Sequence, residues 1–192
     1  IKKSTNKELA ILAKNFFKDT YNMNQSACNS PHFIFWVGRP DEKLKNNFWN
    51  LLNKTVKENF LFDHIHVIDK YSNLIENIVK NEKFNKINMF KNNLYVLDPN
   101  ANTKKISDIR GTNGTFFQKN IRQIDDLKNF INKKCQTVAY FGFSQNELKS
   151  FILKNNLFGI DRIVPIGKAL EIDIVWDGYE VVKNLSRVII VN

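Results

Sequence analysis

Two cysteines are the side chains of this 192-residue sequence whose type and setting most directly suggest chemistry. Cys28 lies in a run of small and amide residues, 21–31, that carries no helical or strand periodicity and is therefore predicted to be a loop. A loop thiolate can attack a carbonyl carbon, and neighbouring backbone N–H groups can stabilise the oxyanion that forms. An incidental loop cysteine explains the same pattern equally well. Cys135 precedes an apolar run and is predicted to be a small, inert core residue.

Other chemistries have weaker support in the sequence. The three histidines are too few and too badly spaced for a zinc site, because His64 and His66 alternate in an apparent strand without a nearby cysteine or carboxylate cluster. The chain contains no Walker loop, no Gly-rich dinucleotide fingerprint and no G-x-S-x-G elbow. The sequence therefore predicts no metal site and no nucleotide-binding loop.

Composition narrows the class of protein. The formal net charge is +10, but the excess is lysine scattered among asparagines, without the arginine and aromatic stripe that stacks bases, so nucleic-acid binding is not predicted. A basic surface that attracts coenzyme A phosphates or an acidic carrier protein, or a simple compositional bias, explains the charge.

The apolar runs are too short for a membrane span, and two distant cysteines indicate a reduced, cytoplasmic setting. The start at Ile1, without methionine or signal region, suggests a piece of something longer.

The elements that would position the loop cysteine follow from local patterns. Thr5 and Glu8 have the spacing of a capping box, which predicts a helix that ends near Asp19. A strand buried on both faces is predicted at 32–37, and Asp41 is predicted to cap the next helix. Further along, the patterns predict a helix around 71–79, a strand at 94–97, a helix at 125–133, a strand at 136–143, a helix at 145–155, a strand at 162–166, a short helix near 179–184 and a last strand at 187–191. This alternation predicts one α/β domain over 1–192, with a largely parallel sheet and helices on both faces.

The run Asn24-Gln25-Ser26-Ala27-Cys28-Asn29-Ser30-Pro31, followed by a strand and a long amphipathic helix, resembles the nucleophile segment of acyl-CoA reductases of the LuxC type. These enzymes are a branch of the aldehyde dehydrogenase superfamily. The segments 114–117, 136–142, 159–170, 176–179 and 185–187 resemble the same family in the same order. The resemblance covers most of the chain and implies a fold like the catalytic domain of an aldehyde dehydrogenase.

The resemblance also implies a mechanism in two steps. Cys28 attacks a fatty acyl thioester of coenzyme A or of an acyl carrier, and NADPH or NADH then reduces the acyl-cysteine to an aldehyde. The backbone N–H of Cys28 and that of a neighbour are the oxyanion-hole candidates. Asn24, Gln25 and Asn29 are expected to shape the loop or the oxyanion site.

Four residues near the end of the chain are candidate substrate-binding groups on the same resemblance: Arg162, Lys168, Trp176 and Tyr179. In a structural interpretation, Arg162 pairs with Asp161 or Asp177, and the tryptophan belongs to the core. In the alternative, the two aromatic residues line a slot for the alkyl chain, and one of the two basic residues meets a phosphate of coenzyme A or of a carrier protein.

The sequence also departs from the superfamily pattern. There, the nucleotide-binding domain lies before the cysteine segment, whereas 27 residues precede Cys28 here. The stretch Gly111–Thr115 stands where the superfamily commonly has a ribose-binding glutamate. We therefore expect this chain alone to bind no nicotinamide cofactor. Two other interpretations stay open: a non-reducing acyl carrier or acyltransferase, and a catalytically inactive domain that holds an acidic partner. A homo-oligomer or an acyl-transferring partner protein is compatible with each.

Overall fold

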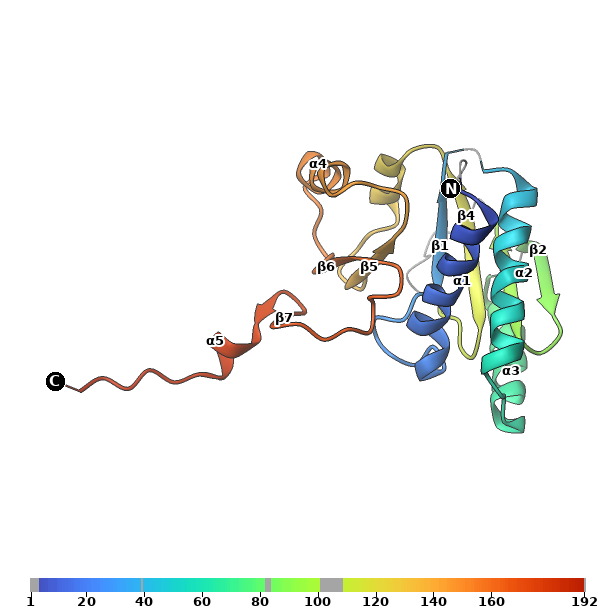
Figure 1. Ribbon diagram of the computed structural model, residues 1–192, viewed down its shortest axis with the longest axis horizontal. Coiled ribbons are helices and arrows are strands. Elements are labelled where there is room, and N and C mark those ends of the chain that lie inside the picture. Colours follow the sequence, from blue (N-terminus) through green and yellow to red (C-terminus); the bar gives the residue numbers. More distant parts are fainter. Residues whose placement is uncertain (1–3, 39, 82–83, 101–108, 192) are drawn as a thin grey trace.

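A mostly parallel sheet forms the centre of the protein (Figure 1). The computed structural model describes residues 4–38, 40–81, 84–100 and 109–191. The sheet has four strands in the order β1-β4-β3-β2. Their bounds are Phe33–Val37 for β1, Phe84–Phe90 for β2, Leu94–Pro99 for β3 and Thr115–Ile121 for β4. β1, β4 and β3 run parallel, and β2 pairs antiparallel with β3. The chain is therefore a mixed α/β protein, as the alternation of elements predicts.

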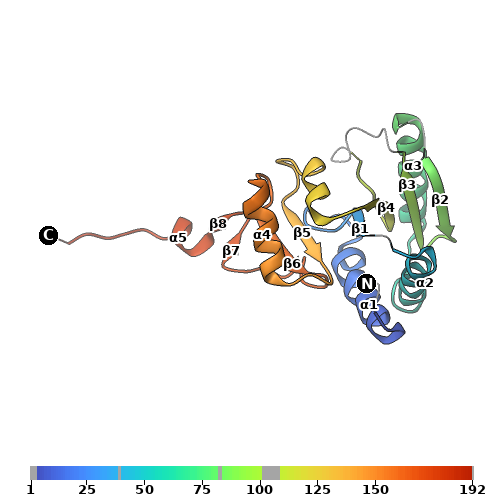
Figure 2. The ribbon, with the colours of Figure 1, turned by 90° about the horizontal axis from the view of Figure 1, so that it is seen from above.

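Helices cover both faces of this sheet, as predicted (Figure 2). They are α1 (Asn6–Thr20), α2 (Glu42–Asn59) and α3 (His64–Asn81). Along β3 the side chains alternate between two cores: Leu94 and Val96 pack with α1 and α2, whereas Tyr95 and Leu97 pack with Leu74 of α3. β3 is thus buried on both faces, which is typical of a central strand in a parallel sheet.

A smaller unit lies beside β1, at the side of the sheet away from β2 (Figures 1 and 2). It consists of η3 (Ile124–Asn129), β5 (Thr137–Tyr140), α4 (Gln145–Asn155) and β6 (Arg162–Pro165), with β5 and β6 paired in parallel. The carboxylate of Asp19, at the end of α1, accepts hydrogen bonds from the backbone N–H groups of Gly167 at 2.6 Å and Ala169 at 3.0 Å. These two bonds hold the turn after β6 against α1.

The last part of the described chain extends away from these two units (Figure 1). It contains the short hairpin of β7 (Val175–Trp176) and β8 (Tyr179–Glu180), then α5 (Val181–Leu185). The predicted strand at 187–191 is wrong, because that segment pairs with no strand of the described chain. Its apolar side chains are largely exposed, so the β-branched composition alone does not produce a strand there.

Three other predictions need correction. His64 and His66 lie in α3, not in a strand, because the helical periodicity continues to Asn81. The helix predicted at 125–133 is the shorter 3-10 helix η3. The strand predicted at 32–37 is not buried on both faces, because β1 is an edge strand and four of its five residues are only half-buried. β2 was not predicted.

None of the described helices is both long and apolar enough to cross a membrane.

Candidate functional site

The loop that carries Cys28 begins with a sharp turn held by one buried side chain. After η1 (Tyr21–Met23), Asn24 and Gln25 adopt left-handed conformations with φ of 49° and 61°. Residues other than glycine rarely adopt this region, so local contacts must compensate for the strain. The Gln25 amide supplies them: its Nε2 donates to the carbonyl oxygens of Pro31 and Thr115, both at 3.0 Å.

The carbonyl oxygen of the same amide accepts from the backbone N–H groups of Gly114 at 3.0 Å and Thr115 at 3.2 Å. Gln25 therefore fastens the Cys28 loop to the start of β4. Its side chain is 1% exposed and fully occupied by these four bonds, which makes it a structural residue of the loop.

Asn24 and Asn29 are also engaged in contacts of the loop. The side-chain amide nitrogen of Asn24 lies 3.2 Å from Nε2 of His66 on α3, and the backbone carbonyl oxygen of Asn24 accepts from the backbone N–H of Asn113. The Asn29 amide donates to the carbonyl oxygen of Ala169, in the turn after β6. The loop is thereby tied both to the helix on the far side of the sheet and to the smaller unit.

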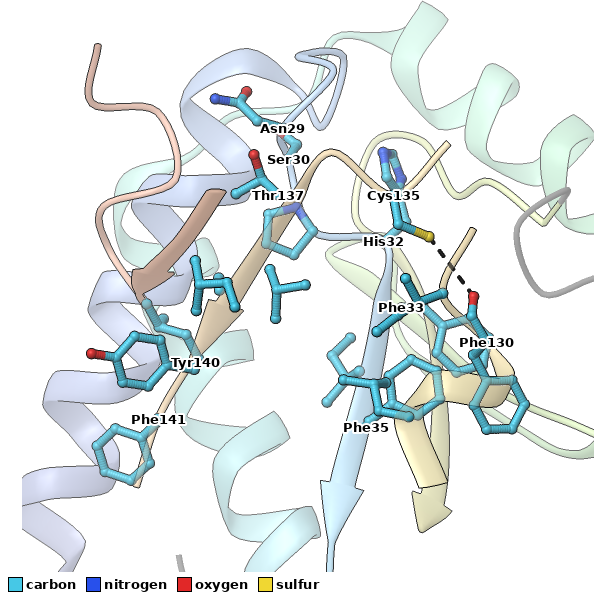
Figure 3. Close-up of a pocket in the computed structure, with 18 of the residues that line it drawn as sticks. Asn29, Ser30, His32, Phe33, Phe35, Phe130, Cys135, Thr137, Tyr140 and Phe141 are labelled. Atoms are coloured by element: carbon cyan, nitrogen blue, oxygen red, sulfur yellow. Dashed lines mark hydrogen bonds between the residues drawn. The ribbon is translucent and has the colours of Figure 1, made fainter. Parts of the chain in front are cut away.

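Cys28 is exposed and lines a large cavity between β1 and the smaller unit. Figure 3 shows other residues that line this cavity. The cavity has a volume of about 350 Å³, within the range of small-molecule sites. The backbone N–H groups of Cys28 and Asn29 donate no hydrogen bond to the described residues, so both are available to a ligand. The thiol thus stands at the border between solvent and an enclosed space.

The walls of the cavity are mostly apolar. β1 contributes Phe33 and Phe35, η3 contributes Leu127, α4 contributes Leu148, and β6 contributes Ile163. The cavity exists because β1 and β5 are both edge strands and do not pair with each other, so side chains line the space between them instead of backbone hydrogen bonds. A space with such walls favours a hydrocarbon chain.

The end of the cavity next to Cys28 carries polar atoms without partners. Ser30 is 4% exposed, and its hydroxyl makes no hydrogen bond to the described residues. His32 is largely buried, and neither of its ring nitrogens has a partner of normal hydrogen-bond geometry there. Burial, together with the nearby charge of Arg110, lowers the pKa of His32 to about 4, against a smaller opposite effect of the Gly111 backbone. The imidazole is therefore neutral at pH 7.

Cys135 lines the same cavity from the entry of β5. It is half-buried, and its Sγ lies 3.8 Å from the carbonyl oxygen of Phe130 and 3.9 Å from Oδ1 of Asn132 (Figure 3). The thiol is a weak hydrogen-bond donor, so both contacts are weak. Its surroundings fit a residue that packs at the edge of the cavity.

The four predicted substrate-binding residues lie outside the cavity lining: Arg162, Lys168, Trp176 and Tyr179. The Arg162 guanidinium donates to the carbonyl oxygens of three residues in the turn after β6 and lies 4.8 Å from the ring centroid of Trp176. It does not pair with Asp161 or Asp177. Lys168 pairs with Glu171, and Tyr179 is 67% exposed. Arg162 thus shares the Ala169 carbonyl oxygen with Asn29 of the Cys28 loop, although none of the four residues lines the cavity. The role of the four residues in binding stays a prediction.

Comparisons with known proteins add no identification. No protein-family model matches the chain, and no curated protein matches it. Among the described residues, no group of three or more His, Cys, Asp or Glu side chains could hold a metal ion. The site is therefore defined by its own geometry: an exposed thiol, an apolar cavity and unpartnered polar atoms between them.

Ser30 and His32 are the residues of this site that the sequence reasoning missed. The sequence signal that could have found them is their position, two and four residues after Cys28. Both residues lie between the candidate nucleophile and the start of β1. Their distinguishing property is burial without a hydrogen-bond partner, and that property depends on how β1 and β5 lie relative to each other.

Proposed function

We propose that this chain is the cysteine-bearing unit of an acyl thioester reductase related to the aldehyde dehydrogenase superfamily, and that Cys28 accepts the acyl group. The observation that carries the proposal is the exposed Cys28 thiol at the border of an apolar cavity of about 350 Å³. The order of loop, parallel strand and helix around Cys28 is compatible with the catalytic domain that the resemblance implies.

The chemical step is a thioester exchange. The Cys28 Sγ attacks the carbonyl carbon of an acyl-CoA or acyl-carrier thioester, and the new C–S bond forms as the bond to the carrier sulfur breaks. The carrier leaves as a thiol and takes the proton that Cys28 loses. The oxyanion of the tetrahedral intermediate needs hydrogen-bond donors, and the free backbone N–H groups of Cys28 and Asn29 are suitable donors.

The cavity would hold the hydrocarbon part of the acyl group. Each CH₂ group transferred from water into an apolar environment contributes about 0.8 kcal/mol. A long acyl chain can therefore gain several kcal/mol from the cavity walls, which places its carbonyl carbon at the thiol. Basic residues of the surface, in a chain of net charge +10, would attract the phosphates of the carrier.

The loop at the start of β4, where the superfamily commonly has a ribose-binding glutamate, does not fit the nicotinamide cofactor that the resemblance implies. The glycine loop at the start of β4 is closely packed: a side chain at Gly111 would meet the Thr115 carbonyl oxygen at 1.9 Å, and one at Gly114 would meet the Tyr21 hydroxyl at 2.6 Å. Gly114 and Thr115 also donate their N–H groups to Gln25. The hydride step is therefore not assigned to these residues.

This lack of fit favours a second candidate, a non-reducing acyl carrier. It would share the first step at Cys28 and then pass the acyl group to another nucleophile. Release of aldehyde when NADPH is added to the acylated chain together with a nucleotide-binding domain identifies the reductase, whereas transfer to an added thiol without aldehyde identifies the carrier.

Intact mass after incubation with decanoyl-CoA tests the proposal. We expect a mass increase of one acyl group, reversed by hydroxylamine, in the parent protein and in Cys135→Ala. Cys28→Ala should remain unmodified. Cys135→Ala is the matched control, because it removes the other thiol of the same cavity. An unmodified parent, or acylation that persists in Cys28→Ala, would refute the proposed role of Cys28.

A further inference from the structure

The polar end of the cavity carries buried polar atoms with which a plain alkyl chain cannot form hydrogen bonds. The Ser30 hydroxyl is buried and has no hydrogen-bond partner among the described residues, and the buried His32 ring nitrogens have none of normal geometry there, although the Gly111 backbone lies close enough to raise the pKa of the ring. Buried polar groups in native proteins are almost always hydrogen-bonded, so an exception next to a ligand cavity points to a partner that the ligand provides. Hydrocarbon provides none.

Burial increases from Cys28 to Ser30, so the thioester carbonyl and these polar groups lie at different depths. Cys28 is exposed, Asn29 is half-buried, and Ser30 is 4% exposed. The thioester carbonyl must meet the exposed sulfur, where the free N–H groups of Cys28 and Asn29 lie. Ser30 and His32 are then next to the part of the acyl group that enters the cavity beyond its carbonyl carbon.

The aromatic walls begin after this polar zone. In Figure 3, Asn29, Ser30 and the His32 ring lie at one end of the cavity, whereas Phe35 and Phe141 lie toward the other. A neutral imidazole has one N–H donor and one acceptor nitrogen, and a serine hydroxyl can donate and accept. Together they match a hydroxyl or keto oxygen, and they do not need a charged group.

We propose that the acyl group taken up by Cys28 carries an oxygen substituent on one of the first carbons beyond its carbonyl, held by Ser30 and His32, and continues as an apolar chain. This inference rests on the proposed acylation of Cys28 and specifies its substrate class. A site built to hydrogen-bond a substrate oxygen disfavours the analogue without it, because its buried polar groups then stay unpaired.

The test compares acylation of the protein by 3-hydroxydecanoyl-CoA and by decanoyl-CoA, followed by intact mass over time. We expect the hydroxylated thioester to react about tenfold faster or more. Ser30→Ala and His32→Phe should each remove most of this preference, chiefly by slowing the hydroxylated ester. Ser26→Ala is the matched control, because Ser26 is an exposed serine of the same loop that does not line the cavity, and it should keep the parent's preference.

Each outcome decides a different point. Equal rates for the two esters in the parent, or a preference that survives in both Ser30→Ala and His32→Phe, would overturn this inference and leave acylation of Cys28 intact. No acylation by either ester would overturn both. Alkylation of Cys28 by iodoacetamide should proceed at the parent's rate in the two variants, because the small reagent does not use the oxygen site. An equal slowing of alkylation would show that the two residues act on the thiol and would also overturn the inference.

Discussion

The buried Gln118 amide of the central sheet and the buried polar groups at the cavity differ in their hydrogen bonding, although the hydroxyl of Thr115 in β4 also lacks a partner among the described residues. In the sheet, the Gln118 amide oxygen accepts from the indole N–H groups of Trp36 at 2.8 Å and Trp49 at 2.9 Å, and its nitrogen donates to Asp98 at 2.7 Å. At the cavity, the Ser30 hydroxyl has no partner among the described residues, and the His32 ring nitrogens have none of normal hydrogen-bond geometry there. The hydrogen bonds of Gln118 stabilise the fold, whereas the polar groups at the cavity can still form hydrogen bonds with a ligand.

Aromatic side chains are also packed more closely in the central sheet than at the cavity. Phe116 of β4 is fully buried, with ring centroids of Phe16 at 5.2 Å and Trp49 at 5.6 Å. Phe35 of β1 is only half-buried and faces the cavity beside Phe33 and Phe130. The ring of Phe116 is therefore closely packed, whereas that of Phe35 leaves apolar surface at the cavity.

The largest stability effect is expected for Phe116→Ala. Removing a fully buried aromatic ring from a closely packed core costs about 4 kcal/mol of unfolding free energy. Urea unfolding followed by far-UV circular dichroism measures the loss. A cost below about 1 kcal/mol would show that the sheet core is not packed as described, and the comparison between the regions would lose its basis.

A pH-dependent effect of intermediate size is expected from Lys70. Its ammonium is buried against the rings of Phe62 at 3.9 Å and Tyr95 at 5.1 Å and donates to the carbonyl oxygen of Asn93. Burial lowers the pKa of Lys70 to about 7 from its usual 10.5. Between these values the unfolded chain binds more protons than the folded chain, so the contribution of Lys70 to stability rises with pH.

In Lys70→Met, the increase of stability with pH should disappear, because methionine keeps most of the packed side chain but has no group that titrates. We expect the unfolding free energy of the parent to gain on that of the variant between pH 7 and pH 9, by at most about 1.4 kcal/mol per pH unit. Urea unfolding at three pH values measures the difference. Parallel pH dependences of the two proteins would mean that the folded protein holds Lys70 with an ordinary pKa.

The smallest stability effect is expected for Phe35→Ala, the same substitution as in Phe116 but at the cavity. Because the ring is half-buried, we expect a cost of about 1.5 kcal/mol. Urea unfolding should give this value, well below that of Phe116→Ala. Equal costs for the two substitutions would contradict the distinction between a closely packed sheet and an open cavity.

Local sequence signals predicted most helices and the strands that have strong patterns. The capping box of Thr5 and Glu8 and the cap at Asp41 define the starts of α1 and α2. β2 was missed because Asn and Lys interrupt its apolar alternation, and its pairing with β3 decides its conformation. The tail at 187–191 has the composition of a strand, but pairing depends on a partner that composition does not reveal.

The site was predictable only in part for a similar reason. The small and amide residues around Cys28 indicate an exposed loop, and the structure places the thiol at the surface. The cavity could not be predicted, because it arises from the separation of two edge strands that are about one hundred residues apart in the sequence. The unpartnered state of Ser30 and His32 follows from the same tertiary arrangement.

The dependence of Cys28 acylation on acyl-chain length tests most directly whether the thiol and the cavity form one site. We expect the rate to increase from acetyl-CoA through hexanoyl-CoA to decanoyl-CoA in the parent protein, because each CH₂ group gains contact with the walls. Val138→Trp, which fills the cavity from β5, should abolish this increase, whereas Leu153→Trp, on the exposed side of α4, should preserve it. A rate that does not depend on chain length, or an increase that survives in Val138→Trp, would contradict the account.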